Sequence, residues 1–115
     1  MRAWLVAILL LVAGTRAIAH HGWNDIDRNK ETSLAGQIKT LYFMNPHVSI
    51  ELEGWVVELV HPGGLDERGV TREMIAPGKA ISLTGFPYKG ADGRMRAAKV
   101  TLDGKTFSML PPSWK

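Results

Sequence analysis

Residues 48–59, VSIELEGWVVEL, decide the fold because they describe a β-hairpin on their own. Val48, Ile50 and Leu52 alternate with polar residues, which is the pattern of a strand buried on one face only. Glu53-Gly54 supplies a tight turn, and a second alternating arm follows it. The sequence therefore predicts two adjacent antiparallel strands packed on a core.

Further strands are predicted on both sides of this hairpin. Before it, residues 34–43 have β character, and Asn45-Pro46 interrupts them because proline disfavours helical backbone in the preceding residue. After it, a Pro-Gly break leads to short helical turns within residues 65–75. Alternation then predicts strands at residues 81–85, 98–102 and 105–109.

Three strands, a short helical insert and two or three more strands are the element order of an OB-type barrel. We therefore expect an all-β fold, a small OB-like barrel of five to six strands with one helical insert. Gly36 and Gly85 suit the sharp bends that such a barrel requires. A small sandwich with a similar number of strands is the alternative.

The first 19 residues have the pattern of a secretory signal peptide. Met1-Arg2 gives a positive start, residues 3–13 are an unbroken apolar run, and Ala17 and Ala19 are small residues at the cleavage site. The apolar run is about half of the roughly 20 residues needed to span a bilayer, so a membrane anchor is the weaker interpretation. We expect cleavage after Ala19 and a periplasmic or secreted chain that begins at His20, outside the membrane.

Removal of residues 1–19 would leave one modest domain. Residues 20–110 would form the barrel, and residues 111–115, PPSWK, a loose tail. Arg2 and Arg16 would leave with the signal, so that 12 of the 14 Lys and Arg balance 11 Asp and Glu. A nearly neutral domain without a basic run argues against nucleic acid as a partner. The chain has no cysteine, so a metal site in it depends on His, Met, carboxylate and backbone ligands.

Cleavage before His20 would create a candidate metal site. The α-amine and Nδ1 of an N-terminal histidine can chelate one metal ion, and Cu(II) gains most from such nitrogen ligands. A third nitrogen would complete a histidine brace, and His47 is the leading candidate for it, with His21 as the alternative. Met44 could add a soft sulfur ligand for Cu(I).

Other interpretations of these residues stay open at this point. The two histidines at the mature terminus are equally compatible with a loose polar chain end. His47 could be a turn residue whose ring bonds a backbone carbonyl, and His61 favours that role over metal binding. Glu58 is expected to face water, with a hydrogen bond to a metal-binding histidine as the alternative.

The chain resembles an uncharacterised family of small secreted bacterial proteins across nearly the whole mature sequence. The stretches that carry the resemblance are AHHGW, FMNPHVSIELE, WVVELVHPGGLDERGVT, IAPGKAISLTGFP and DGRMRAAKVTLDGKTF. The matching positions are His20, His21, Trp23, Asn45, Pro46, His47, Trp55, Val57, Glu58, Pro77, Gly78 and Gly85. The resemblance implies export to the periplasm and an OB-like β fold, and it implies no established activity.

The chain departs from the family pattern in two places. It is shorter between Leu52 and Trp55, and it carries His61-Pro62-Gly63 where the relatives carry Gly-Ser-Pro. The resemblance therefore does not extend to His61 as a ligand.

The leading hypothesis is a periplasmic copper-binding or copper-handling protein that exchanges the metal with a donor or acceptor protein. The alternative is a metal-independent OB-type envelope binding module that contacts a protein or a small ligand. The chain has no GxSxG nucleophile motif and no phosphate-binding glycine loop, so we do not expect an enzyme. An oxidative copper enzyme is the minor third hypothesis.

Overall fold

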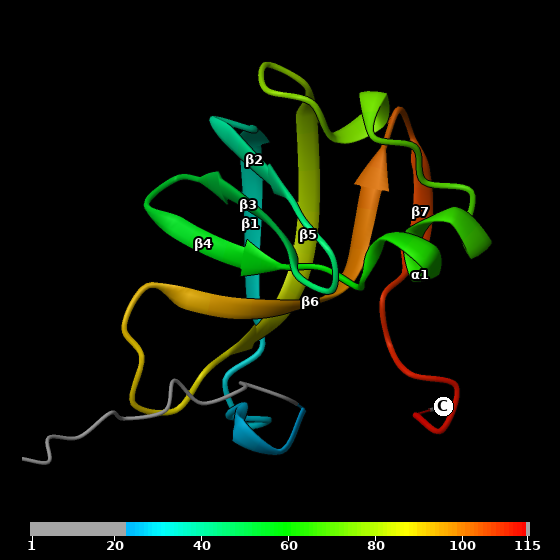
Figure 1. Ribbon diagram of the computed structural model, residues 1–115. Coiled ribbons are helices and arrows are strands. Elements are labelled where there is room, and N and C mark those ends of the chain that lie inside the picture. The colour runs from blue at the N-terminus through cyan, green and yellow to red at the C-terminus, as the bar shows by residue number, and fades with distance from the viewer. Residues whose placement is uncertain (1–22, 115) are drawn as a thin grey trace, which may run out of the picture.

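The computed structural model describes residues 23–114, and the predicted hairpin stands at its centre (Figure 1). Strands β3 (Val48–Leu52) and β4 (Trp55–Glu58) pair antiparallel, with Ile50 opposite Val57. Both of these side chains are fully buried. The two turn residues between the strands have positive φ angles, which is the backbone of a tight two-residue hairpin loop.

The other elements surround this hairpin and follow the predicted order. They are the 3-10 helices η1 (Trp23–Asp25) and η2 (Glu73–Ile75), helix α1 (Pro62–Glu67), and strands β1 (Thr32–Gln37), β2 (Thr40–Phe43), β5 (Ala80–Pro87), β6 (Arg94–Leu102) and β7 (Lys105–Ser108).

The seven strands form one curled sheet in the order β1-β5-β6-β4-β3-β2. β7 is outside this order and pairs with the C-terminal half of β6. Strands β4 and β6 run parallel, and the other paired strands run antiparallel. β1 and β2 are consecutive in the chain and stand at the two ends of the strand order, so the chain itself links these ends. This is the OB-like arrangement that the sequence predicts, curled into a half-barrel (Figure 1).

Several strands differ from their predicted bounds, and β5 (Ala80–Pro87) extends past its predicted end at Gly85. The predicted strand at residues 34–43 is divided into β1 and β2, because the backbone N–H groups of Ile38 and Lys39 donate to Lys79 and Glu51 on different neighbours. β6 begins at Arg94, four residues before the predicted start at Ala98. Its first residues keep the strand alternation, with Met95 and Ala97 fully buried between outward-facing arginines.

The helical insert starts earlier than the sequence indicates. α1 begins at Pro62, whose fixed φ suits the first helical position, and His61 caps the helix by accepting the Gly64 N–H at Nδ1 over 3.1 Å. His61 therefore has the turn role that the sequence favours. No helix formed by residues 23–114 is long and apolar enough to cross a bilayer.

One apolar core fills the inside of the curled sheet, and the helical insert closes it. The largest fully buried side chains are Ile38, Val48, Ile50, Leu52, Val57, Leu65, Ile75, Met95, Val100 and Met109. Leu65 and Ile75 come from the helical insert, whereas the strands contribute most of the others. A chain without disulfides relies on this core for its stability.

Gly85 lies where β5 bends over β6. Thr84 pairs with Lys99 and Gly85 pairs with Ala97, so Ala98 is an extra residue at a β-bulge. A Cβ at Gly85 would overlap the carbonyl oxygen of Arg96 and would lie 2.8 Å from Met95 Cε. The close approach of the two strands therefore requires glycine.

We expect Gly85→Ala to lower the free energy of unfolding by about 3 kcal/mol, because the clash falls on backbone that cannot move aside cheaply. Gly36→Ala is the matched control, since its Cβ would meet only the mobile Glu53 side chain, and it should cost less than about 1 kcal/mol. Urea unfolding of both variants checks this. Equal destabilisation would contradict the role assigned to Gly85.

Candidate functional site

A line of residues crosses the outer face of the sheet from β2 to β6. Tyr42 pairs with Ser49, Ser49 pairs with Glu58, and Glu58 pairs with Arg96. Residues paired in register project on the same side of a sheet. This line, called the outer-face row below, joins the start of β3, the end of β4 and the first part of β6.

Glu58 is buried, which overturns the expectation that it faces water. Its side chain is 9% exposed and accepts a hydrogen bond from Arg94 Nη2 to Oε2 over 3.1 Å. Arg96 Nη1 lies 3.9 Å from Glu58 Oε1. The two arginines on β6 supply the positive charge that a buried carboxylate needs.

Trp23 and Trp114, at the two ends of the described chain, pack on each other, and Trp23 also lies on Arg96. The Arg96 guanidinium lies 4.7 Å from the centre of the Trp23 ring, and the Trp23 and Trp114 rings are 5.0 Å apart. Arg28 lies 3.7 Å from the centre of the Trp114 ring, a close cation–π contact. η1 and the C-terminal segment therefore lie at the same end of the barrel (Figure 1).

The C-terminal segment, which the sequence predicts to be a loose tail, makes contacts with the rest of the fold as far as Trp114. Trp114 packs on Trp23, and the backbone that leads to it is also held. Arg68, the residue that follows α1, donates to the carbonyl groups of Ser108 over 2.7 Å and Leu110 over 3.1 Å. We refer to Glu58, Arg96, Trp23 and Trp114 together as the terminal stack.

The Asn45-Pro46-His47 corner lies beside the end of β4. His47 and Met44 are both exposed, and Met44 is 65% exposed. The Met44 N–H donates to the His47 carbonyl over 3.2 Å, which closes the corner, and the Leu59 N–H donates to the Val48 carbonyl over 2.9 Å. The corner is therefore attached to the strand that carries Glu58.

The structure brings some of the predicted site residues together and leaves others outside. His47 and Met44 share one exposed corner. His20 and His21, together with the predicted signal peptide and its cleavage site, lie outside the described residues. Within residues 23–114, no group of three or more His, Asp or Glu side chains is placed to hold a metal ion.

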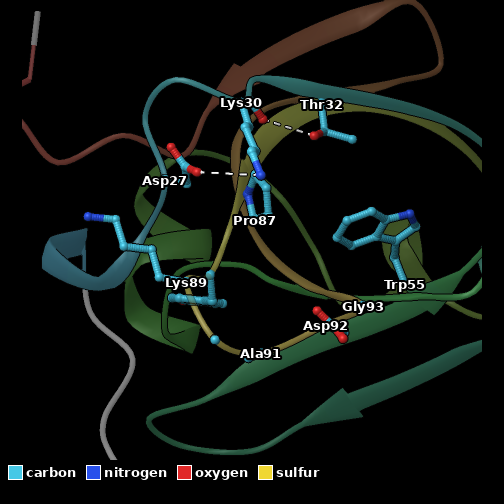
Figure 2. A pocket seen from close by; sticks show the side chains of 11 residues that line it. Asp27, Lys30, Thr32, Trp55, Pro87, Lys89, Ala91, Asp92 and Gly93 are labelled. Carbon is cyan, nitrogen blue, oxygen red and sulfur yellow. Dashed lines mark hydrogen bonds and ion pairs between the residues drawn. The ribbon is translucent and has the colours of Figure 1, made fainter.

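A pocket of about 530 Å³ opens at the other end of β4, where the lead-in segment meets the β5–β6 loop. Figure 2 shows Trp55 on one side of it and Asp27, Lys30, Lys89 and Asp92 around its rim. The two acids and two bases balance, and Lys30 lies 3.9 Å from Asp27. No sequence motif indicates this pocket, because its lining comes from three separate segments of the chain.

The chain matches the model of a family of unknown function, DUF6152, over residues 7–98. It belongs to this family. The matched range includes His20 and His47. It also includes every residue of the terminal stack except Trp114. No curated protein and no solved structure matches the chain. Membership in the family confirms the resemblance seen in the sequence.

Tyr88 follows β5 and contributes to the environment of the buried carboxylate. Burial raises the pKa of Tyr88 to about 12, while a hydrogen bond with Arg96 acts in the opposite direction and the Glu58 charge adds to the rise. The folded protein therefore favours the neutral phenol. This part of the stability is present below pH 10 and is lost as the pH rises toward 12.

We expect the free energy of unfolding of the wild type to fall between pH 10 and pH 12 by about 2–3 kcal/mol more than that of Tyr88→Phe. Phenylalanine carries no ionisable phenol, so the difference between the two proteins removes the titration of the lysines that they share. Urea unfolding at several pH values measures it. Parallel pH curves for the two proteins would contradict the shifted pKa.

Proposed function

We propose that the mature protein is a periplasmic copper-binding protein that exchanges the metal with a donor or acceptor protein. His20 would chelate copper through its α-amine and its ring Nδ1. His47 would provide the third nitrogen, with His21 as the alternative to it. Met44 would supply a soft sulfur when the metal is Cu(I).

The observation that supports this proposal is the position of Trp23, the first described residue. Trp23 lies on Arg96, in the outer-face row, and Ser49 of the same row is two residues after His47. From Ser49 to Arg96 is two strand spacings, roughly 10 Å. His20 is three residues before Trp23, and three extended residues also reach roughly 10 Å. His47 lies a further two residues, roughly 7 Å, along the chain from Ser49, so this span brings His20 toward His47 and the two side chains would cover the remaining distance.

The exposure of the corner suits a protein that transfers its metal rather than one that stores it. Tyr42 and Met44 are exposed large hydrophobic residues, and Met44 lies in the same corner as His47. A partner that approaches this corner reaches His47 and a thioether at once. Buried ligands would require part of the fold to open first.

The test compares the mature chain that begins at His20 with an alanine-extended chain, which carries four alanines before His20. The extension moves the α-amine away from both His20 and His21, so that neither ring can share a chelate with it, and we expect Cu(II) affinity to fall by about 100-fold. A competition titration measures the affinity, and electron paramagnetic resonance reports a nitrogen-rich Cu(II) site in the first chain only.

His47→Ala in the chain that begins at His20 should weaken binding to a smaller extent and change the spectrum, since one of three nitrogens is removed. His61→Ala is the matched control, because His61 is occupied by capping α1, and it should leave the Cu(II) spectrum unchanged. Equal, weak binding by the His20 and alanine-extended chains would overturn the copper proposal. Mass spectrometry of the exported protein identifies its first residue.

A second candidate function is metal-independent binding of a small ligand, and the pocket beside Trp55 favours it. Its balanced charges and indole wall suit a neutral polyhydroxyl molecule, which can hydrogen-bond to acids and amines and stack on an aromatic face. Under this alternative, the alanine-extended chain should bind glucose or N-acetylglucosamine as well as the chain that begins at His20.

Tryptophan fluorescence titrations with these two sugars test the alternative, and Trp55→Ala should abolish the response. Trp23→Phe is the control for a change at a tryptophan outside the pocket. A response that survives Trp55→Ala, or no response at all, would contradict this alternative.

A further inference from the structure

We propose that the groove between β7 and α1 binds an extended peptide that ends in a free carboxylate. The groove has a volume of about 540 Å³, and its lining includes Arg68, Thr106, Ser108 and Leu110. α1 and the end of β7 lie side by side in Figure 1, and Arg68 bridges them. The peptide pairs with the outer edge of β7 as an added strand, and its carboxylate lies on Arg68. No histidine takes part, so the proposal is independent of copper.

β7 offers an open edge for such a strand. Among the strands of residues 23–114, it pairs with β6 alone. The Met109 N–H donates to the Ala98 carbonyl over 2.7 Å, so Phe107, two residues earlier, also directs its backbone groups at β6. Thr106 and Ser108 direct theirs to the opposite side. An edge strand of this kind is a template for a further strand.

The Ser108 carbonyl confirms this direction, because it accepts a hydrogen bond from Arg68 Nε over 2.7 Å. Within the part of the chain that the structure describes, the N–H and C=O of Thr106 and the N–H of Ser108 have no backbone partner. Two donors and one acceptor therefore point to the side on which Arg68 lies. A peptide can pair with all three through its main chain, as in other complexes formed by strand addition.

Arg68 supplies the charge that selects a carboxylate. Its guanidinium donates to three backbone carbonyls, those of Gly64 over 2.9 Å, Ser108 over 2.7 Å and Leu110 over 3.1 Å. It forms no ion pair with an Asp or Glu side chain of the described residues. The positive charge is thus fixed in position but not neutralised. A guanidinium has five N–H donors, and those that remain can bind a carboxylate through strong, charge-assisted hydrogen bonds.

The lining and the place of Arg68 define the peptide further. Phe107 and Leu110 contribute apolar surface to the groove, which suits an apolar last side chain. Arg68 lies at the Ser108 end of β7, so a peptide with its carboxylate there runs parallel to β7. The Ser108 N–H is then a second donor for the carboxylate. The partner is therefore a protein with an exposed, extended and apolar C-terminus.

The test titrates the isotope-labelled mature protein with acetyl-Thr-Val-Thr-Leu and follows its backbone amides by NMR. The peptide carries either a free carboxylate or a C-terminal amide. We expect the Thr106 and Ser108 amide signals to shift and the exchange of their hydrogens to slow, because both N–H groups gain an acceptor. The free-carboxylate peptide should bind about tenfold more tightly than the amide, since amidation removes the charge that Arg68 binds.

Three variants test the edge and the charge. Thr106→Pro removes an N–H that faces outward and should abolish binding, while an edge strand tolerates proline. Thr106→Ala is the matched control, because it keeps the N–H and loses only the 2.8 Å bond to the Thr101 hydroxyl, and it should bind like the wild type. Glu67→Gln removes the acidic side chain beside Arg68 in the groove. It should strengthen binding of the free-carboxylate peptide about twofold and leave that of the amide unchanged.

Four results would overturn the proposal. Equal affinity for the two peptides would reject Arg68 as a carboxylate site, and no binding of either would reject the groove as a peptide site. Shifts around the pocket at Trp55, with Thr106 and Ser108 unchanged, would place the peptide elsewhere. Shifts of Thr106 and Ser108 that depend on protein concentration without peptide would identify a second copy of the chain as the occupant. The copper proposal stands or falls separately.

Discussion

The parallel pairing of β4 with β6 depends on the ion pairs of the buried Glu58 carboxylate. Glu58 is the one charged residue among residues 23–114 that is almost completely shielded from solvent, and burying it unpaired would cost several kcal/mol. Its partners, Arg94 and Arg96, come from β6, the strand that runs parallel to β4. A parallel pair cannot be made by a hairpin, so the ion pairs help to fix the long crossover that defines the topology. Arg96, one of these two arginines, also lies against the Trp23 ring.

The sequence predicts the parts of the fold that depend on residues close together in the chain. The hairpin, the order of strands and helical insert, and the bend at Gly85 are all readable, because alternation and turn residues are short-range signals. β6 begins before the predicted start at Ala98, because Arg94 and Arg96 alternate with the buried Met95 and Ala97 and so extend the strand.

The candidate site is less predictable, because its members come from distant segments. The histidine corner is visible as a motif, but its relation to the chain entry depends on a register between β3, β4 and β6 that no local pattern encodes. Glu58 illustrates the difficulty: it lies between two apolar residues, and its burial is explained by Arg94 and Arg96 on the neighbouring strand β6. Trp114 gives no signal in sequence beyond being a large aromatic near the end of the chain.

A small domain without cysteine has few ways to fix its chain ends, and this fold uses charge and aromatic stacking for the purpose. Such contacts are weak one by one, but Arg96 is already held by Glu58, so little further ordering is needed when Trp23 packs on it. The C-terminal segment is added to this prepared surface and is held in turn by Arg68. The lead-in segment is therefore held by side-chain contacts with Arg96 and Trp114 in addition to its backbone hydrogen bonds with Pro87 and Lys89.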